Sequence, residues 1–544
     1  MTNDNLQNKF KFLKKILLFL WSRVMSLQDL PYELLSYTLK KVRLNPLLAL
    51  RQTSIDCRNV ATVALANQKL QFTCPSGISN ASKNLYYCSQ RTNWLDVPFV
   101  TTAKKLEIYS FFDFLMIKYV LQGITHLYIK NCNNLTDVSD LGNLHTLDIN
   151  GCKYLTDVSA LGKLHTLNLI DCNILTNVSA LENLHTLVLT CGLQLTDISA
   201  LGNLHTLDLS CCRELTDVNA LGNLHTLDLT NNRVLTDVNA LGNVHTLDLS
   251  FCRRLTNVNA LGNVHTLNLS GCDALTDVSA LGNVHTLNLS ECDALTDVSA
   301  LGNVHTLNLS LCEFLTDVSA LKNVHTLILS ASHFLTDVSA LGNVHTLDLS
   351  ECLEIENVSA LGGVKFLNLA CCVKITDVSA LVNVYDLNLY GCNITDVSPF
   401  YRVNTFRYGS CSVITDVSAL SEVKIIYLDY CSGITDVSAL SKVNELKLMH
   451  CSGITDVSAL GEVKDLDLSD CPGITDVSAL GRVTKLKLSN CFGITDVSAL
   501  GGVQDLDLSH CFAISGVGAL ANVPKLSVYG CSAAVLALVK MFKK

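Results

Sequence analysis

Histidine recurs at one fixed spacing in the middle of the chain. Eleven histidines follow one another every 20 residues, from His145 to His345. Imidazole is a common metal ligand and changes its charge near neutral pH. A metal site also needs ligands that converge on one point, and the repeats supply no carboxylate or thiolate in such an arrangement. We therefore expect no metal site, and we interpret the histidines as a partly exposed row along one edge of a sheet.

Aspartate, serine and histidine, the residue types of a hydrolytic site, also recur together. Asp337, Ser339 and His345 have counterparts in many other repeats. A catalytic site needs one unique arrangement in a pocket, whereas a repeated set points to a structural role in each copy. The chain also lacks a glycine-rich phosphate-binding loop. The sequence therefore predicts a protein that is not an enzyme and needs no cofactor.

Cysteine is frequent, but its positions argue against disulfides. Eighteen of the 24 cysteines occupy one repeat position, where Gly192, Asn232 and Ser332 stand in the three exceptions. Exchange with Asn and Ser indicates a small, buried, hydrogen-bonding group. Side chains about 4.8 Å apart on parallel strands also do not point toward each other as a disulfide requires. We expect free thiols and a reducing compartment.

These residues are positioned by a short repeat, of which "LTDVSALGNVHTLDLSEC" from Leu335 to Cys352 is one copy. Twenty anchor residues from Leu135 to Ile514 are spaced by 20 residues, except for one step of 19 from Ile375 to Ile394. Such a period predicts a solenoid. Alternation around Leu347 and Leu349 predicts a short strand. The segment 338–343 is too short for an α-helix and suits a 3₁₀ turn, begun by local bonds of Asp337 and Ser339.

The pattern Leu-x-x-Leu-x-Leu-x-x-Cys resembles the leucine-rich repeat family over residues 103–531. The stretch "ITDVSPF", Ile394 to Phe400, is similar to the short repeats of internalin-type proteins. The resemblance implies an α/β solenoid, an arc with a parallel β-sheet on its concave face and short 3₁₀ or turn segments on its convex face. Two degenerate strands, around Leu106 and Leu127, are expected to begin the stack. A cap helix is expected at residues 532–544.

Charge divides the chain into two parts. Residues 1–60 hold 10 Lys and Arg against 4 Asp and Glu, whereas the remainder holds 29 against 45, a net charge of −16. An acidic solenoid is a poor ligand for a phosphate backbone, so no nucleic-acid partner is expected. The basic and apolar extension 1–25 has an apolar core, 16–21, that is too short to span a bilayer. A basic amphipathic helix that lies on a membrane surface and an extension of little consequence both stay open for this segment. We expect no membrane partner for the chain.

The segment that follows predicts a small, all-helical head at residues 26–66, joined to the repeats by a linker or cap at 67–102. Its stretch "LPYELL", Leu30 to Leu35, resembles the opening of an F-box, although Cys57 stands where the family commonly has Trp. An F-box docks onto the Skp adaptor of a cullin–RING ubiquitin ligase. The residues that the resemblance assigns to adaptor binding are Leu30, Pro31, Leu34, Leu35, Leu47 and Leu50.

The combined resemblance implies an intracellular substrate-recognition subunit of such a ligase. The head would bind the adaptor, the repeats would bind a target protein, and the chain would be monomeric outside the complex. F-box and repeat arrays of this kind resemble proteins of protists and of the large DNA viruses that infect amoebae. Two alternatives stay open: a surface or secreted leucine-rich-repeat adhesin, and a non-catalytic repeat scaffold without a specific partner.

The uniform repeats change between Tyr385 and Tyr430, where the single 19-residue step occurs. Strand positions here carry tyrosine and arginine, the residue types enriched at binding hot spots. We therefore predict partner binding at Tyr390, Arg407, Tyr408 and Tyr427. The alternative interpretation is local decay of one repeat, in which the odd length is merely tolerated.

Overall fold

The structure is a computed structural model that describes residues 85–87, 105–108, 124–192, 194–410 and 412–542. These residues belong to two compact units, which are divided in the sequence between Glu214 and Leu215. The extension 1–25 and the F-box-like head 26–66 lie outside the described residues, and so do all six predicted adaptor-binding residues. Their assignment stays a prediction.

Each repeat folds as a short 3₁₀ helix followed by a short strand, as its sequence pattern predicts. In the repeat that begins at Leu335, the 3₁₀ helix η14 spans Ser339–Asn343 and the strand β14 spans Thr346–Asp348. The backbone N–H of Ser339 donates to Oδ1 of Asp337 at 2.8 Å and so begins the turn. Leu347 and Leu349 are buried in the core. The predicted strand, turn and core positions are confirmed.

The first unit pairs its strands in parallel. Neighbouring repeats align with a shift of 20 residues, so that Thr146 pairs with Thr166. Strand β1 lies within the segment predicted as a linker and pairs in parallel with β2. The strands are β1 (Leu85–Tyr87), β2 (Lys105–Ile108), β3 (His126–Lys130), β4 (Thr146–Asn150), β5 (Thr166–Ile170), β6 (Thr186–Val188) and β7 (Thr206–Asp208), and the 3₁₀ helices are η4 (Ser139–Leu141), η5 (Ser159–Leu161), η6 (Ser179–Leu181) and η7 (Ser199–Asn203).

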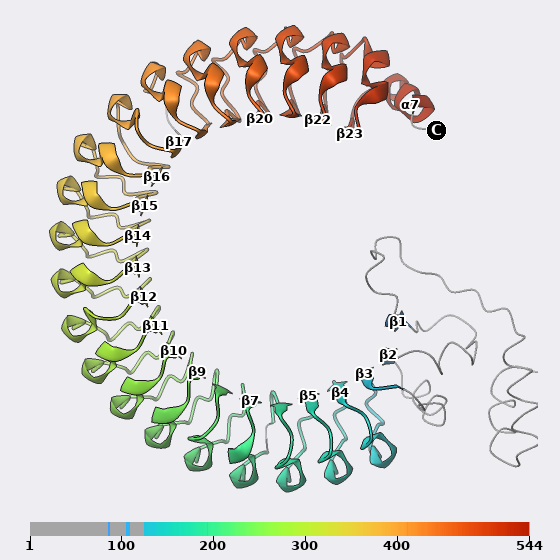
Figure 1. The fold of residues 1–544 in the computed structure, drawn as a ribbon, viewed down its shortest axis with the longest axis vertical. Coiled ribbons are helices and arrows are strands. Elements are labelled where there is room, and N and C mark those ends of the chain that lie inside the picture. The colour runs from blue at the N-terminus through green and yellow to red at the C-terminus, as the bar shows by residue number, and fades with distance from the viewer. Residues whose placement is uncertain (1–84, 88–104, 109–123, 193, 411, 543–544) are drawn as a thin grey trace, which may run out of the picture. The chain divides into compact units, whose positions relative to one another are not determined.

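The second unit continues the same repeat. Its strands line the concave side of the unit and its 3₁₀ helices lie on the convex side (Figure 1). The strands are β8 (Thr226–Asp228), β9 (Thr246–Asp248), β10 (Thr266–Asn268), β11 (Thr286–Asn288), β12 (Thr306–Asn308), β13 (Thr326–Ile328), β14, β15 (Phe366–Asn368), β16 (Asp386–Asn388), β17 (Thr405–Gly409), β18 (Ile425–Asp429), β19 (Glu445–Lys447), β20 (Asp465–Asp467), β21 (Lys485–Lys487), β22 (Asp505–Asp507) and β23 (Lys525–Ser527). The 3₁₀ helices are η8 (Asn219–Leu221), η9 (Asn239–Asn243), η10 (Asn259–Asn263), η11 (Ser279–Asn283), η12 (Ser299–Leu301), η13 (Ser319–Asn323), η14, η15 (Ser359–Gly363), η16 (Ser379–Asn383), η17 (Ser398–Phe400), η18 (Ser418–Glu422), η19 (Ser438–Lys442), η20 (Ser458–Glu462), η21 (Ser478–Arg482), η22 (Ser498–Gly502) and η23 (Val517–Asn522).

The cysteines form a buried row of thiols that donate hydrogen bonds to the preceding repeats. Sγ of Cys352 donates to the carbonyl of Leu329 in the preceding repeat at 3.2 Å, and Cys471 makes the same bond to Leu448 at 3.0 Å. All cysteines in the described part of the chain are free thiols. Burial raises the pKa of the Cys352 thiol to about 12, so that it stays protonated and can donate. The expected hydrogen-bonding role is confirmed for these residues.

The C-terminal repeat is followed by a helix, as expected. Helix α7 spans Ala533–Phe542 and buries Val535 and Val539. It contacts η23, the last 3₁₀ helix of the stack. Within the described ranges, no helix combines the length and the apolar character needed to cross a membrane.

Candidate functional site

The histidines form a stacked row, as their spacing predicts. In the second unit, the ring centroids of successive histidines from His225 to His345 lie 4.5–4.7 Å apart. Nδ1 of each ring hydrogen-bonds to the hydroxyl of the next residue, as between His245 and Thr246 at 3.2 Å. Parallel rings do not direct their nitrogens at a common point. Across the ranges that the structure describes, no group of three or more His, Cys, Asp or Glu side chains could hold a metal ion.

The sheet surface changes character where the histidine row ends. The ring of Phe366 lies 5.3 Å from His345, and Tyr385 continues the row 5.9 Å further on. Beyond it lie three residues that we call the tyrosine patch. Tyr390 follows the end of β16, Arg407 lies in β17 and Tyr427 lies in β18. Arg407 and Tyr427 are direct partners in the strand pairing. Three of the four predicted partner-binding residues are therefore brought together on the exposed side of the sheet.

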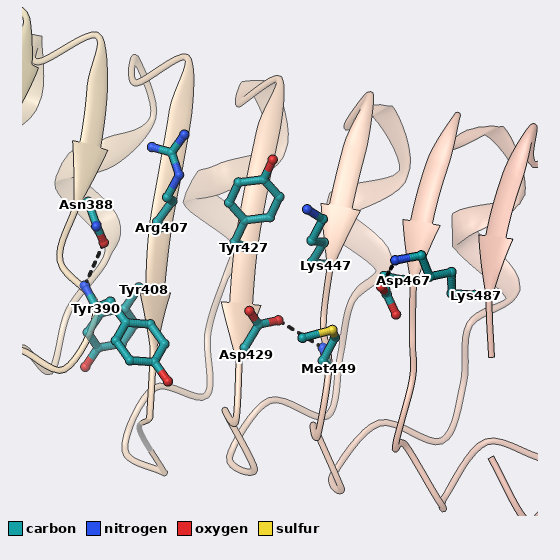
Figure 2. Close-up of a pocket in the computed structure, with 10 residues that line it drawn as sticks. All are labelled: Asn388, Tyr390, Arg407, Tyr408, Tyr427, Asp429, Lys447, Met449, Asp467 and Lys487. Atoms are coloured by element: carbon teal, nitrogen blue, oxygen red, sulfur yellow. Dashed lines mark hydrogen bonds and ion pairs between the residues drawn. The ribbon is translucent and has the colours of Figure 1, made fainter. Parts of the chain in front are cut away.

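A pocket of about 450 Å³ opens beside the tyrosine patch (Figure 2). Strands from β16 to β21 provide its walls, so it lies within the second unit. Aromatic rings, a thioether and side chains of both charges surround the space. The lining residues are Asn388, Tyr390, Arg407, Tyr408, Tyr427, Asp429, Lys447, Met449, Asp467 and Lys487.

The absence of a side chain at Gly409 makes room in this surface. A Cβ atom at Gly409 would lie 2.6 Å from Cε2 of Tyr390, which is closer than real Cβ contacts come. The ring of Tyr390 therefore lies across this glycine. Its hydroxyl accepts a hydrogen bond from Ser410 at 3.0 Å. The glycine thus sets the position of the first ring of the patch.

Arg407 and Tyr427 are also held by neighbouring strands. Arg407 forms an ion pair with Asp386 on β16. The hydroxyl of Tyr427 donates to Oε1 of Glu445 at 2.7 Å, and the ammonium of Lys447 lies 4.2 Å from the centre of its ring. Burial, and then the bond to Glu445, raise the pKa of Tyr427 to about 12. The side chains of the patch, of which Tyr390 is exposed and Arg407 and Tyr427 are half-buried, are therefore largely fixed before any partner arrives.

Tyr408 does not belong to the exposed patch, and the prediction that it binds a partner is corrected. Its side chain is only 1% exposed, because it points into the core where other repeats carry Leu. Its hydroxyl donates to the carbonyl of Ile394 at 2.9 Å and approaches that of Cys392 at 3.4 Å. A buried hydroxyl engaged in this way supports the surface from beneath and is not available to a partner.

The core under the patch is repacked with aromatic residues. The rings of Phe400 and Phe406 stack at 4.9 Å, and Phe406 lies 6.3 Å from the ring of Tyr408. All three side chains are almost completely buried. The single missing residue lies between Cys392 and Ile394, after β16, so β16 and β17 still pair in register at Asp386 and Thr405. The shortened repeat has therefore kept a filled core and a continuous sheet.

Asp429 is a member of the site that the sequence prediction missed. It ends β18, and its Oδ1 accepts a hydrogen bond from the backbone N–H of Met449 at 3.1 Å. Burial, as the largest effect, raises the pKa of this carboxyl. Asp429 is the one acidic residue at its repeat position between Asn150 and Tyr529. This difference from the other repeats was the available signal.

Charges on the strands from β20 to β23 pair with each other, and one of these pairs, Asp467 with Lys487, lines the pocket. Lys485 binds Asp465 at 2.8 Å, Lys487 binds Asp467 at 3.1 Å, and Lys525 binds Asp505 at 2.7 Å. Opposite charges on neighbouring strands stabilise the sheet and need no ligand. These strands therefore do not by themselves indicate a binding site.

The repeat geometry identifies the architecture. The described residues form a leucine-rich-repeat solenoid. No protein-family model matches the sequence, and no curated protein matches it either. Among solved structures, the chain is similar to an internalin (inlF) of Listeria monocytogenes, with 18% identity over 76% of this chain and 88% of that one and a TM-score of 0.24.

Two further solved structures show a similar likeness. The functional domain of InlJ from Listeria monocytogenes, which includes a cysteine ladder, has 22% identity over 72% of this chain and 74% of its own, with a TM-score of 0.33. A leucine-rich-repeat protein of Leptospira interrogans has 14% identity over 82% of this chain and 95% of its own, with a TM-score of 0.33. The assignment of the fold rests on the strands, turns and core of the repeats described above.

Proposed function

We propose that this protein is the substrate-recognition subunit of a Skp–cullin–RING ubiquitin ligase, with its repeats binding the target protein through the tyrosine patch. Repeat solenoids offer extended sheet surfaces to other proteins. The observation that carries the proposal is the pocket beside Tyr390, Arg407 and Tyr427, which interrupts an otherwise uniform surface. Tyrosine and arginine are the residue types that most often anchor protein interfaces.

The state of the patch supports binding over decay of a repeat. Decay would leave voids in the core and unpaired polar groups under the surface. The core here is filled by Phe400 and Phe406, and the hydroxyl of Tyr408 bonds to a carbonyl of the shortened connection. Ser410, Asp386 and Glu445 hold the three side chains of the patch. Side chains fixed in advance lose less conformational entropy when a partner binds.

The proposed role assigns no chemistry to this chain. The head, residues 26–66, binds the Skp adaptor through Leu30, Pro31, Leu34, Leu35, Leu47 and Leu50. Ubiquitin transfer belongs to the partners, and the chain raises its rate by holding the target nearby. Such a complex assembles inside the cell, where the thiols of the cysteine row remain reduced.

Capture of a purified Skp adaptor by the full-length chain tests this role. The wild-type protein is expected to retain the adaptor on a column, and the double variant Leu30→Ala, Pro31→Ala is expected to lose it. A matched control replaces Tyr32 and Ser36, which fall between the pattern residues. Loss of capture in the control as well, or equal capture by the Leu30 and Pro31 variant, contradicts the assignment. Glycosylation or signal cleavage of the expressed chain would favour the adhesin alternative instead.

A further inference from the structure

We propose that the pocket beside the tyrosine patch takes a lysine or arginine side chain of the target protein, with the cationic head bound to the carboxylate of Asp429. This inference rests on the proposed binding role of the repeats and is independent of the adaptor. It specifies the chemistry that the pocket recognises.

The shape of the pocket suits a long side chain with an apolar stem. Asp429 lies between Gly409 and Met449 along the sheet, and Tyr427 lies on the same strand two residues before it (Figure 2). Because Gly409 has no side chain, the ring of Tyr390 can lie across it and line the pocket beside Asp429. The stem of a lysine or arginine can pack against a tyrosine ring and a thioether while its charged head reaches the carboxylate.

Asp429 forms no direct ion pair among the described residues, although the nearby charges of Lys447 and His450 act on its carboxyl and lower its pKa against the larger effect of burial. Its Oδ1 accepts the N–H of Met449, and no ion pair joins it to a Lys, Arg or His. Lys447 points toward Glu445 at 3.3 Å and toward the ring of Tyr427. Lys487 binds Asp467. A half-buried carboxylate without a direct ion pair is incompletely solvated, and an incoming cation restores part of that lost interaction.

Three cationic side chains also line the pocket, but each has a carboxylate of its own, so that Asp429 is the lining charge without a direct ion pair among the described residues. The pairs are Arg407 with Asp386, Lys447 with Glu445 and Lys487 with Asp467. The carboxylate of Asp467, on a strand beyond Asp429, is almost completely buried and, although it is paired with Lys487, it still acts as a negative charge on Asp429. The chain from residue 61 onward carries a net charge of −16. A potential of this sign attracts basic surfaces and increases their rate of association.

Selection of random short peptides displayed on phage, with the full-length protein as bait, tests the inference. Peptides selected by the wild-type chain are expected to share a Lys or Arg whose replacement by Ala lowers their affinity by about tenfold or more. Asp429→Asn keeps an oxygen for the N–H of Met449 and removes the charge. It is expected to lower the affinity of the same peptides by a similar factor.

Asp348→Asn is the matched control, because it removes one carboxylate of the same sheet at a position where other repeats already carry Asn. Asn288 and Asn308 stand at the repeat position of Asp348, and each accepts the backbone N–H of the serine two residues later, as Asp348 does. It is expected to leave peptide affinity unchanged. Selection that yields no peptides, peptides without a shared basic residue, or equal affinity for the Asp429→Asn variant overturns the inference. Adaptor capture is measured separately, so a failure of the proposed ligase role is distinguished from a failure of this pocket assignment.

Discussion

The hydroxyl of Tyr408 donates a 2.9 Å hydrogen bond to the carbonyl of Ile394, the residue that follows the one shortened connection in the array. The connection between Cys392 and Ile394 is one residue shorter than its counterparts, so a backbone group there must find another partner. Tyr408 supplies this partner from a core position that carries Leu in the neighbouring repeats. The relationship explains how the array changes its length without losing its sheet.

Tyr408→Phe should therefore destabilise the protein. The substitution leaves the carbonyl of Ile394 buried without this donor, which costs about 1–3 kcal/mol. The urea midpoint of the far-UV circular dichroism signal measures the effect. Tyr385→Phe is the control, because its side chain is 45% exposed, and its midpoint should stay at the wild-type value. Equal midpoints for all three proteins would mean that the buried hydroxyl stabilises nothing.

Ser332 interrupts the cysteine row, and replacing it by Cys should stabilise the protein. Its hydroxyl is buried and has no hydrogen-bond partner among the described residues. The longer reach of a thiol would restore the bond that Cys312 makes to Leu289 and Cys352 makes to Leu329. We expect Ser332→Cys to raise the free energy of unfolding by about 1 kcal/mol.

The reverse change provides the comparison for the cysteine row. Cys352→Ser should lower the free energy of unfolding by about 1–3 kcal/mol, because it removes the bond to Leu329. Both variants are measured by urea denaturation under reducing conditions. A destabilised Ser332→Cys protein, or a neutral Cys352→Ser protein, would contradict the hydrogen-bonding role assigned to the thiols.

Acid should weaken the protein through the aspartates that begin the 3₁₀ turns. Hydrogen bonds from the following serines lower the pKa values of Asp277, Asp297, Asp317 and Asp337 in the folded state. A carboxyl whose folded pKa is lowered contributes stability above its unfolded pKa, near pH 4, and this contribution is lost as the pH falls through the folded value. The urea midpoint should therefore drop as the pH falls from about 5 to about 3.

Asparagine at all four positions should reduce that dependence. Asn177 and Asn357 already begin turns with the same bond, at 3.0 and 2.9 Å, so the substitution keeps the geometry and removes the titration. The midpoint of the fourfold variant should change less between pH 5 and pH 3 than that of the wild type. Asp293→Asn, outside these turns, should keep the wild-type profile. Identical profiles for the fourfold variant and the wild type would refute this source of acid sensitivity.

The regular part of the fold could be predicted from sequence because each repeat has the same spacing. Leu347 and Leu349 alternate with polar residues, so the strand and the core positions follow. Exchange of Cys352 with Asn elsewhere indicated a hydrogen-bonding group, whereas the hydroxyl of Ser332 makes no hydrogen bond among the described residues. Tyr408 was misplaced because Arg407 and Tyr408 were both taken as exposed. Neighbouring residues of a strand face opposite sides, and alignment with Leu389 and Leu428 would have assigned Tyr408 to the core.

The pocket could not be predicted in the same way. Its shape depends on the ring of Tyr390 lying across Gly409, which is a packing relation between two strands. Asp429 differs in type from every other residue at its repeat position, but its burial and its lack of an ion pair required the structure. The sequence therefore indicated where the repeat surface becomes irregular, and the structure identified the pocket and the half-buried carboxylate of Asp429 at that place.

Quantitative mass spectrometry of proteins retained by the tagged full-length chain in cells tests the central claim most directly. Three proteins are compared. They are the wild type, a patch variant that carries Tyr390→Ala, Arg407→Ala and Tyr427→Ala together, and a head variant that carries Leu30→Ala and Pro31→Ala. Thermal melting confirms that the variants are folded. The account predicts that the patch variant keeps the Skp adaptor and loses a defined set of proteins. These proteins are ubiquitylated by the ligase partners when the wild type is present, and the head variant binds them without their becoming ubiquitylated. The same retained set for the patch variant and the wild type, or no adaptor with either, would contradict it.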